Sequence, residues 1–280
     1  MTARNRCIRR RRVGGAALAA LILAGGCGGF AQEASEYRLN KDFFAAFGRD
    51  FAAVVTAPLH WDRRDLGRFA LVSGATLVAV AFDESIRDWM QDHRTDFSGD
   101  ASPIFEKIGN GAYLLGFSAA LYAAGEIWPS PGLRKTALLS VESLATASAL
   151  AAVMKFVVGR ARPYTGEGSL SFHMFSIESA YHSFPSGHTA AAFAVATTIA
   201  QQTRGVAVDI LAYGAATLVG LSRIHDDEHW ASSVLAGGAL GYFVASKING
   251  RHRSGEPLKT VDLGIQLGPE RQAVTLTYSF

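Results

Sequence analysis

The chain has 280 residues, of which 49% are hydrophobic, and a formal net charge of +3. The positive charge comes from residues 1–31, which hold six arginines and no Asp or Glu, so 21 basic and 24 acidic residues remain beyond them. A net charge of −3 in that remainder excludes a nucleic-acid-binding protein that relies on a basic surface. The length suits one domain with appendages.

Residues 1–31 are predicted to be an export signal. The arginine cluster is followed by an uncharged run, Val13–Gln32, with small residues near its end, which is the pattern of a secretory signal peptide. Cleavage is expected after Ala31; lipidation at Cys27 and an uncleaved anchor are the alternatives. Cys7 and Cys27 are the only cysteines, so the cleaved chain has no disulfide.

The body of the chain is expected to be an all-α, multi-helix bundle. Residues 32–68 are polar and predict short amphipathic helices on a surface, and residues 69–250 hold the helical domain. Segments that are rich in Ala, Leu, Val and Gly and lack the alternation of strands predict six apolar helices at 69–83, 109–127, 136–157, 188–203, 206–222 and 231–248. The segment 84–107 is polar, and Asp83-Glu84-Ser85 at its start is expected to be a helix end or surface turn. In the tail, 251–280, period-two alternation predicts a short β-hairpin.

Whether these helices cross a membrane stays open at this point. The longest uncharged runs, Ile108–Gly125 and Trp230–Ser246, fall short of the roughly 20 apolar residues that a span needs. A mean hydropathy of +0.15 nevertheless favours a membrane. A bundle resting on the membrane surface and an integral membrane protein are both compatible with these features.

Two strings point to a phosphate site. In the string that runs to Pro163, Lys155 and Arg162 lie seven residues apart, about two helical turns, so both cations can reach one side. In Phe184–Ala190, a turn leads into an apolar helix with Ser186 as N-cap, Gly187 next and His188 in the first turn. The free N–H groups at such a helix start attract anions.

A third string adds Ser222-Arg223 and, six positions after the arginine, His229. One lysine, two arginines, a Ser-Gly turn and two histidines are what phosphoryl transfer without a metal requires. The three strings, in this order and over about residues 136–248, resemble the motifs of the type 2 phosphatidic acid phosphatase superfamily. Its members include lipid phosphatases, bacterial acid phosphatases and vanadium haloperoxidases.

The resemblance implies a role for each of these residues. His229 would be the nucleophile that forms a phosphohistidine, and His188 the acid that protonates the leaving oxygen. No metal or other cofactor would be needed. The phosphate would be held by Lys155, Arg162, Ser186, Gly187 and Arg223. The apolar bundle favours a phosphorylated lipid as substrate, in the cell envelope with the site facing the periplasm, and a small phosphoester is the alternative.

Ser233 departs from the family pattern, which has an Asp four residues after the second His. Position i+4 shares a helical face with His229, where a carboxylate would orient the ring and stabilise its positive charge. A serine hydroxyl at this catalytic position can accept the ring N–H but carries no charge. If that is its role, Ser233→Asp is expected to raise the rate. Alternatively, Asp226 or Asp227 supplies the carboxylate.

Other functions remain as alternatives. His225–His229 spells H-x-x-E-H, so the two histidines could hold zinc with Glu228 as base, although a third protein ligand would be needed. A vanadium haloperoxidase would hold vanadate in the same cradle. Because of Ser233, a protein that binds phosphate without turnover is the alternative from outside the enzymes.

Overall fold

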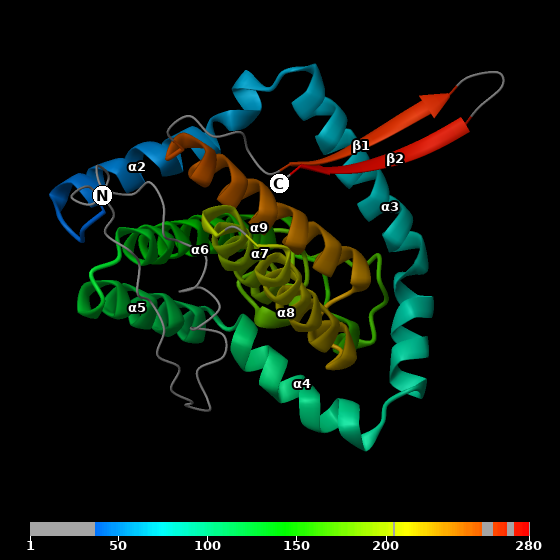
Figure 1. Ribbon diagram of the computed structural model, residues 1–280. Helices are drawn as coiled ribbons and strands as arrows, with labels where there is room; N and C mark the ends of the chain where they lie inside the picture. Colours follow the sequence, from blue (N-terminus) through cyan, green and yellow to red (C-terminus); the bar gives the residue numbers. More distant parts are fainter. Residues whose placement is uncertain (1–36, 204, 254–259, 268–271, 280) are drawn as a thin grey trace, which may run out of the picture.

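A computed structural model describes residues 37–203, 205–253, 260–267 and 272–279, and the expected export signal with Cys7 and Cys27 lies outside them. The expectation of an all-α bundle is confirmed (Figure 1). The α-helices are α2 (Lys41–Val55), α3 (Arg63–Asp92), α4 (Asp96–Gly109), α5 (Gly111–Ile127), α6 (Pro131–Val158), α7 (Gly187–Gln202), α8 (Val206–His225) and α9 (Ala231–Arg251). The short 3-10 helices are η1 (Ala57–His60), η2 (Pro163–Thr165) and η3 (Ser179–Tyr181).

The C-terminal tail contains the expected hairpin. Strands β1 (Thr260–Leu267) and β2 (Gln272–Ser279) pair antiparallel, with Thr260 opposite Ser279 and Leu267 opposite Gln272.

Helix α3 is longer than the apolar stretch at 69–83 suggested. It begins after Asp62, whose side chain accepts the N–H groups of Arg64 and Asp65 in a capping box, and it continues to Asp92. The expectation of a helix end or surface turn at Asp83-Glu84-Ser85 is therefore wrong. The polar residues there extend α3, and Thr95 caps the next helix, α4, by accepting the N–H of Ser98. Charged side chains are compatible with helix as long as the caps satisfy its ends.

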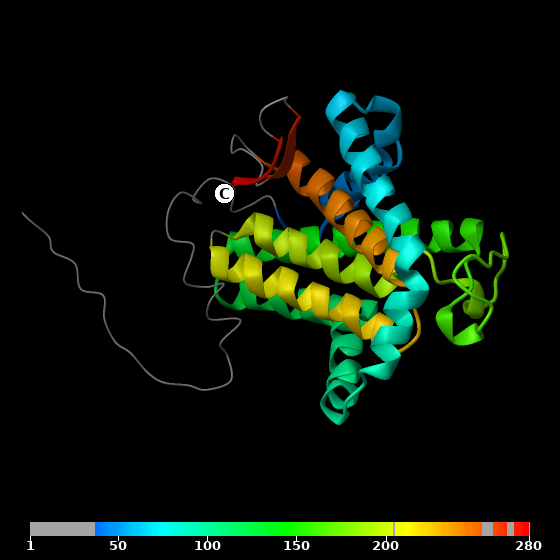
Figure 2. The same cartoon turned by 90° about the vertical axis from the view of Figure 1, so that its right-hand side faces the viewer.

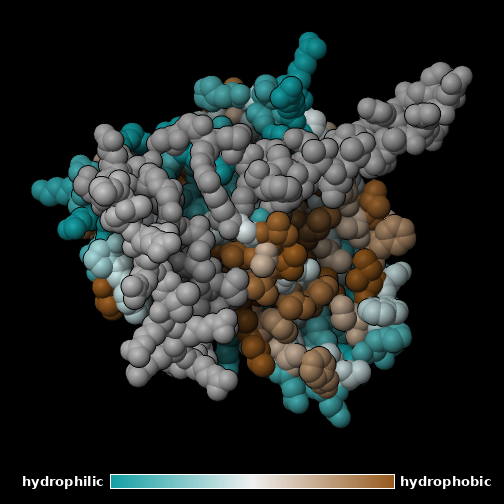
Figure 3. Space-filling model, viewed as in Figure 1, coloured by the Kyte–Doolittle hydropathy of each residue, from teal (hydrophilic) through white to brown (hydrophobic). Residues whose placement is uncertain are grey.

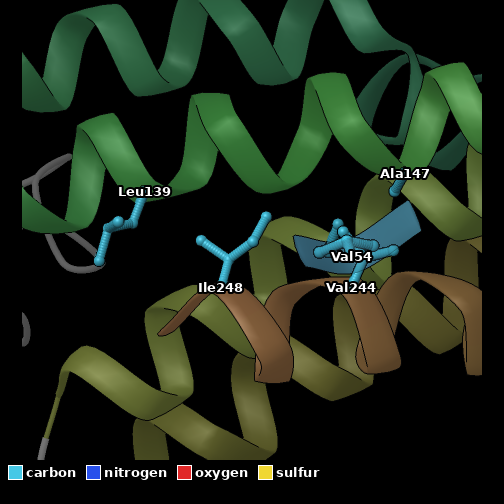
Figure 4. Close-up of a cluster of buried hydrophobic side chains, with 6 residues drawn as sticks. Val54, Leu139, Ala147, Val244 and Ile248 are labelled. Atoms are coloured by element: carbon cyan, nitrogen blue, oxygen red, sulfur yellow. The ribbon is translucent and has the colours of Figure 1, made fainter. Parts of the chain in front are cut away.

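Helices α6, α7, α8 and α9 form the centre of the molecule, and α7 packs against the other three. The largest buried cluster joins α6, α7 and α9 to α2 (Figure 4). It consists of Val54, Leu139, Ala147, Ala194, Val244 and Ile248. The small alanines allow the helices to approach closely, and the branched side chains fill the space between them.

The order of the helices brings distant parts of the chain to one end of the bundle. Helices α6 and α8 stop at this end, and α7 and α9 begin there, because consecutive helices run in opposite directions (Figure 2). We call it the motif end. At the opposite end α2 lies against the last turn of α9, where Asp50 pairs with Arg251 and accepts a 2.5 Å hydrogen bond from His252.

The chain is a membrane protein. Four helices, α3, α6, α8 and α9, are long and apolar enough to cross a bilayer. In α3 only 6% of the apolar window is buried inside the protein, so most of its hydrophobic surface faces outward. Figure 3 shows hydrophobic surface gathered over the middle of one face, with hydrophilic surface near α2 and α4. Such a surface suits a lipid environment.

Candidate active site

The three sequence strings meet at the motif end. The last turn of α6 carries Lys155, and the segment that follows it carries Arg162. Helix α7 begins there with Gly187 and His188, capped by Ser186. Arg223 lies in the last turn of α8. The loop to α9 holds His229, so residues far apart in sequence share one site.

The sequence predicted an anion-binding backbone at the start of α7, and Ser186 is the N-cap of the helix there. The hydroxyl of Ser186 accepts the N–H of Thr189 at 3.5 Å and a hydrogen bond from the Thr189 hydroxyl at 2.9 Å. The N–H of Ser186 itself donates to the carbonyl of Ser233 at 2.9 Å, which ties the turn to α9. A Cβ at Gly187 would lie 3.2 Å from Nζ of Lys155. Glycine here therefore lets the ammonium come close to the positive end of the helix dipole.

Three cations surround this helix start. Arg162 pairs with Glu228, and Arg223 pairs with Asp226 and, at 3.4 Å, with Glu106. Within the described part of the chain, no hydrogen-bond partner contacts the buried Nε atoms of Arg162 and Arg223. Unpaired buried donors cost free energy. The cradle thus keeps N–H groups that an anion would satisfy.

His229 is almost fully buried, with 2% of its surface exposed. Its Nδ1 lies 2.6 Å from the carbonyl oxygen of Ser183. Because a carbonyl only accepts, Nδ1 carries the proton and Nε2 keeps its lone pair. Burial, and then the charges of Lys155 and Arg162, hold the pKa of His229 well below its ordinary value, although the bond to Ser183 opposes them. The ring is therefore neutral at neutral pH.

The pKa of His188 is affected by the same cations. Burial lowers its pKa to about 4, and the positive charges of Arg223, Lys155 and Arg162 add to the effect. The cations that lower the pKa of His188 include both of those that lower the pKa of His229, which places the two rings in one electrostatic site. A phosphate dianion among these cations would offset their charge and raise both pKa values.

Ser233 has other partners than the i+4 spacing suggested. Its hydroxyl accepts a 3.2 Å hydrogen bond from Nη1 of Arg160, and the ring N–H of His229 goes to the Ser183 carbonyl. The acidic alternatives also have other partners. Asp226 bonds to Ser102, His225 and Arg223, and Asp227 accepts two hydrogen bonds, at 2.6 and 2.7 Å, from Arg87. A backbone carbonyl thus takes the place in which the family pattern has a carboxylate.

Sequence reasoning missed a buried ion pair beneath the site. Arg160, 2% exposed, donates to Oδ2 of Asp83 at 2.8 Å and to the hydroxyl of Ser232 at 2.7 Å. Asp83 comes from α3, and its Oδ1 accepts the N–H of Ser232 at 2.8 Å, at the start of α9. The carbonyl of Arg160 accepts the N–H of Ser183 at 3.0 Å. Arg160, from the first string, thus contacts the residue just ahead of the second string through its carbonyl and the start of α9, just after the third string, through its side chain. The sequence signal for this ion pair was weak, because Asp83 is followed directly by Glu84 at the start of a polar segment.

The remaining members of the H-x-x-E-H string have separate partners. His225 contacts Asp226 at 3.0 Å and the hydroxyl of Ser98 at 3.1 Å, while Glu228 pairs with Arg162. Among the described residues, the group with metal-ligand spacing is elsewhere, at Asp50, Glu142 and His252 near the opposite end.

Comparison with known proteins agrees with the motifs. The profile of the PAP2 superfamily matches residues 136–249. A lipid A 1-phosphatase of Porphyromonas gingivalis is 31% identical over 174 residues, which are 61% of this chain and 35% of that protein. A lipid A 1-phosphatase of Rhizobium johnstonii is 37% identical over 94 residues, which are 33% of this chain and 38% of that protein. One of Rhizobium etli is 27% identical over 199 residues, which are 66% of this chain and 82% of that protein. The chain thus spans little more than a third of the first two relatives.

Two solved structures are similar in part. A transmembrane PAP2-type phosphatidylglycerolphosphate phosphatase from Bacillus subtilis has 24% identity and a TM-score of 0.49, over 75% of this chain and 94% of that one. Aquifex aeolicus LpxE has 19% identity and a TM-score of 0.46, over 60% of this chain and 95% of that one. Residues 136–249, which carry the three motifs in order and bring them to one end of a helical bundle, match the PAP2 superfamily.

Proposed function

We propose that the protein is a metal-independent phosphatase that removes phosphate from a membrane lipid through a phosphohistidine intermediate. The observation that carries the proposal is the state of His229. It is a buried, neutral imidazole with its proton fixed on Nδ1 by Ser183, beside Lys155 and Arg162. A neutral imidazole lone pair next to a phosphate-binding cradle is the arrangement that nucleophilic attack on phosphorus requires.

The reaction proceeds in two displacements. Nε2 of His229 attacks phosphorus, the bond to the ester oxygen breaks, and its electron pair stays on that oxygen. His188, protonated once the dianion has entered, gives its proton to the leaving oxygen. Water then attacks the phosphohistidine, passes a proton to His188 and releases inorganic phosphate. Lys155, Arg162 and Arg223 stabilise the charge that develops on the phosphoryl oxygens.

Both arginines of the site already pair with a carboxylate before the substrate binds. Glu228 and Asp226 pair with Arg162 and Arg223 and keep the guanidinium groups in place. A phosphate dianion carries more charge than either carboxylate and binds arginine in the same bidentate manner. We therefore expect the substrate to compete with these two carboxylates for the guanidinium groups.

A lipid substrate is favoured by the setting of the site. The site lies at the end of a bundle whose helices are apolar enough to cross a bilayer, so a lipid headgroup can reach it from the membrane surface. All three curated relatives are named lipid A 1-phosphatases, and the chain covers 82% of one of them. Our leading candidate is consequently a phosphate on a glycolipid headgroup.

The distribution of charge favours a site outside the cytoplasm. Lys and Arg are enriched on the cytoplasmic side of membrane proteins. Basic residues here gather near the end opposite the site, at Arg38, Lys41, Arg49, Arg63, Arg64, Arg68, Arg134, Lys135, Lys247, Arg251 and Arg253. Acidic residues predominate at the motif end, among them Asp88, Asp92, Asp96, Asp100, Glu106, Glu167 and Glu178. We place the motif end in the periplasm.

This orientation constrains the N-terminus. Helices α3, α5 and α6 precede the site in the chain, and Figure 2 shows α3 (cyan) crossing the central helices at a steep angle. If all three cross, residues ahead of α3 lie on the side opposite the site, which is the cytoplasm. A cleaved export signal would instead start the chain outside. A cleaved export signal and a periplasmic site are therefore both possible only if one of these three helices does not cross the bilayer.

A substrate screen tests the proposal. The purified protein in detergent is given lipid A, phosphatidylglycerophosphate, phosphatidate and p-nitrophenyl phosphate, with and without EDTA, and released phosphate is measured. We expect hydrolysis of at least one lipid that EDTA does not reduce. Release from p-nitrophenyl phosphate alone would favour a broad acid phosphatase. Phosphate binding without release would favour the binding-protein alternative, and loss of activity with EDTA would favour zinc.

A further inference from the structure

The segment between α6 and α7 exposes an unusual number of large apolar side chains. We call Leu170, Phe172, Met174, Phe175 and Ile177 the apolar loop; all five are exposed, Leu170 at 71% and Ile177 at 86%. A soluble protein rarely presents so many together without a partner. Figure 2 shows this segment beyond the end of α6, beside α3, at the motif end.

The loop is held in this position by backbone hydrogen bonds. The N–H of Phe175 donates to the carbonyl of Phe156 at 2.7 Å, and the N–H of His173 donates to that of Gly159 at 2.6 Å. Gly159 has a φ of 58°, and a Cβ there would lie 1.8 Å from the carbonyl oxygen of His173, so the close approach requires glycine. The apolar side chains are thus exposed on a well-bonded backbone.

The other side of the loop is fixed to α3. The N–H and hydroxyl of Ser169 both donate to Oε1 of Glu84, at 3.0 and 3.1 Å. Two helices with membrane-spanning length, α3 and α6, therefore anchor the loop from its two sides.

The exposed surface of α6 continues into the loop. Val153, Phe156 and Val157 are exposed near the end of this helix, within one of the four candidate spans. The ring of Phe156 meets that of Phe175 edge to face, with centroids 5.6 Å apart. The apolar loop therefore adjoins the part of α6 that is apolar enough to lie in a bilayer. Lipid acyl chains would be a favourable environment for both surfaces.

The loop also reaches the phosphate cradle. The segment that leads to the loop begins after Arg162, and the guanidinium of Arg162 lies 5.9 Å from the ring centroid of the exposed Tyr164. The N–H of Arg162 donates to the carbonyl of Ala180 at 2.9 Å, where the chain returns toward Ser186. The segment between Arg162 and Ala180 therefore carries the apolar loop and contacts a cation of the site at both of its ends.

We propose that the apolar loop is a lipid-binding surface: it enters the leaflet on the motif side and binds the acyl chains of the substrate while the headgroup phosphate lies at Arg162. The proposal rests on the proposed lipid phosphatase function. Leu170, Met174 and Ile177 supply most of the exposed apolar surface. His173 lies within the loop and Glu167 and Glu178 flank it, and the 2.7 Å pair between His173 and Glu167 lowers the cost of placing these groups at the membrane surface.

The kinetic test compares a long-chain substrate with a soluble one. The double variant Leu170→Glu/Ile177→Glu is assayed on long-chain lipid phosphate in vesicles and on p-nitrophenyl phosphate. Ser179→Glu, which adds a charge at an exposed polar position of the same segment, is the matched control. We expect kcat/KM on the lipid to fall roughly tenfold or more in the double variant alone, with no change on the soluble ester. An unchanged rate on the lipid, or an equal fall on both substrates, would overturn the proposal.

A second measurement needs no catalysis, so it separates failure of this proposal from failure of the proposed function. Ile177→Trp and Ser179→Trp proteins are reconstituted in phosphatidylcholine vesicles with brominated acyl chains, and their fluorescence is compared with that of the parent. We expect additional quenching for Ile177→Trp and less for Ser179→Trp. If tryptophan at 177 is not quenched, water, a second copy of the chain or another protein surrounds the loop, and the proposal is wrong.

Discussion

The 2.6 Å hydrogen bond from Nδ1 of His229 to the carbonyl oxygen of Ser183 determines which ring nitrogen is free to react. The acceptor belongs to the backbone just ahead of the Ser186 turn, so the element that we propose to bind phosphate also orients the proposed nucleophile. This bond accounts for the tautomer of His229 without the Asp that the family pattern has four residues later. It also changes what substitutions at Ser233 should do.

Ser233→Asp is predicted not to raise the phosphorylation rate. The new carboxylate would be fully buried within reach of Arg160, which already pairs with Asp83. Two buried carboxylates would then share one guanidinium, and an uncompensated buried charge costs several kcal/mol. We expect lower thermal stability and an equal or slower single-turnover rate. Ser233→Ala, which removes one 3.2 Å hydrogen bond, should change the rate only slightly. A tenfold acceleration in Ser233→Asp would show that a carboxylate at 233 reaches His229.

Asp83→Asn is predicted to destabilise the protein strongly. It leaves the buried guanidinium of Arg160 without its counter-charge, and breaking a buried pair in this way costs about 3–5 kcal/mol. The start of α9 would loosen with it, since Asp83 accepts the N–H of Ser232. The measurement is thermal unfolding in detergent, with kcat and KM determined separately below the transition.

Asp88→Asn is the matched control, because its side chain is 70% exposed and lies 3.8 Å from Arg87. Such surface pairs contribute about 1 kcal/mol or less. Equal stability of the two variants would contradict a structural role for the Asp83–Arg160 pair.

The pKa of His188 is predicted to depend on the bound anion. In the free site, burial and the three cations lower it to about 4. Because these cations disfavour the imidazolium, a dianion among them must raise the pKa, by about one unit or more. NMR titration of ring-labelled protein, with and without inorganic phosphate, measures both values. A His188 pKa that phosphate leaves unchanged would place this ring outside the anion site.

The proposed orientation predicts the side on which each end of the bundle lies. A reporter inserted after Gly205, between α7 and α8, should be cytoplasmic, and one inserted after Thr95, between α3 and α4, should be periplasmic. The physical reason is the excess of Lys and Arg near the end opposite the site. The reverse pattern would place the site in the cytoplasm. If both reporters lie on the same side, the chain between the two insertions crosses the membrane an even number of times, which would contradict the proposed orientation.

The sequence allowed the helical class and the cradle residues to be predicted because both depend on local patterns. Apolar stretches predicted the six helices, and three short strings predicted Lys155, Arg162, Ser186 and Arg223 as one group; the structure brings these residues together. Asp83 could not be paired with Arg160 in this way, because their contact joins α3 to the segment after α6 and no periodicity relates the two. The Ser183 acceptor is a backbone atom, and its position depends on the folded turn rather than on residue type.

Trapping of the phosphoenzyme tests the central claim most directly. Protein is mixed with ³²P-labelled substrate, quenched within one turnover and analysed for acid-labile, alkali-stable label. We predict label on the parent protein, retained label on His188→Ala with slower release of the alcohol, and none on His229→Ala. A His229→Ala protein that still forms the labelled intermediate, or that hydrolyses the substrate at the parental rate, would contradict the account.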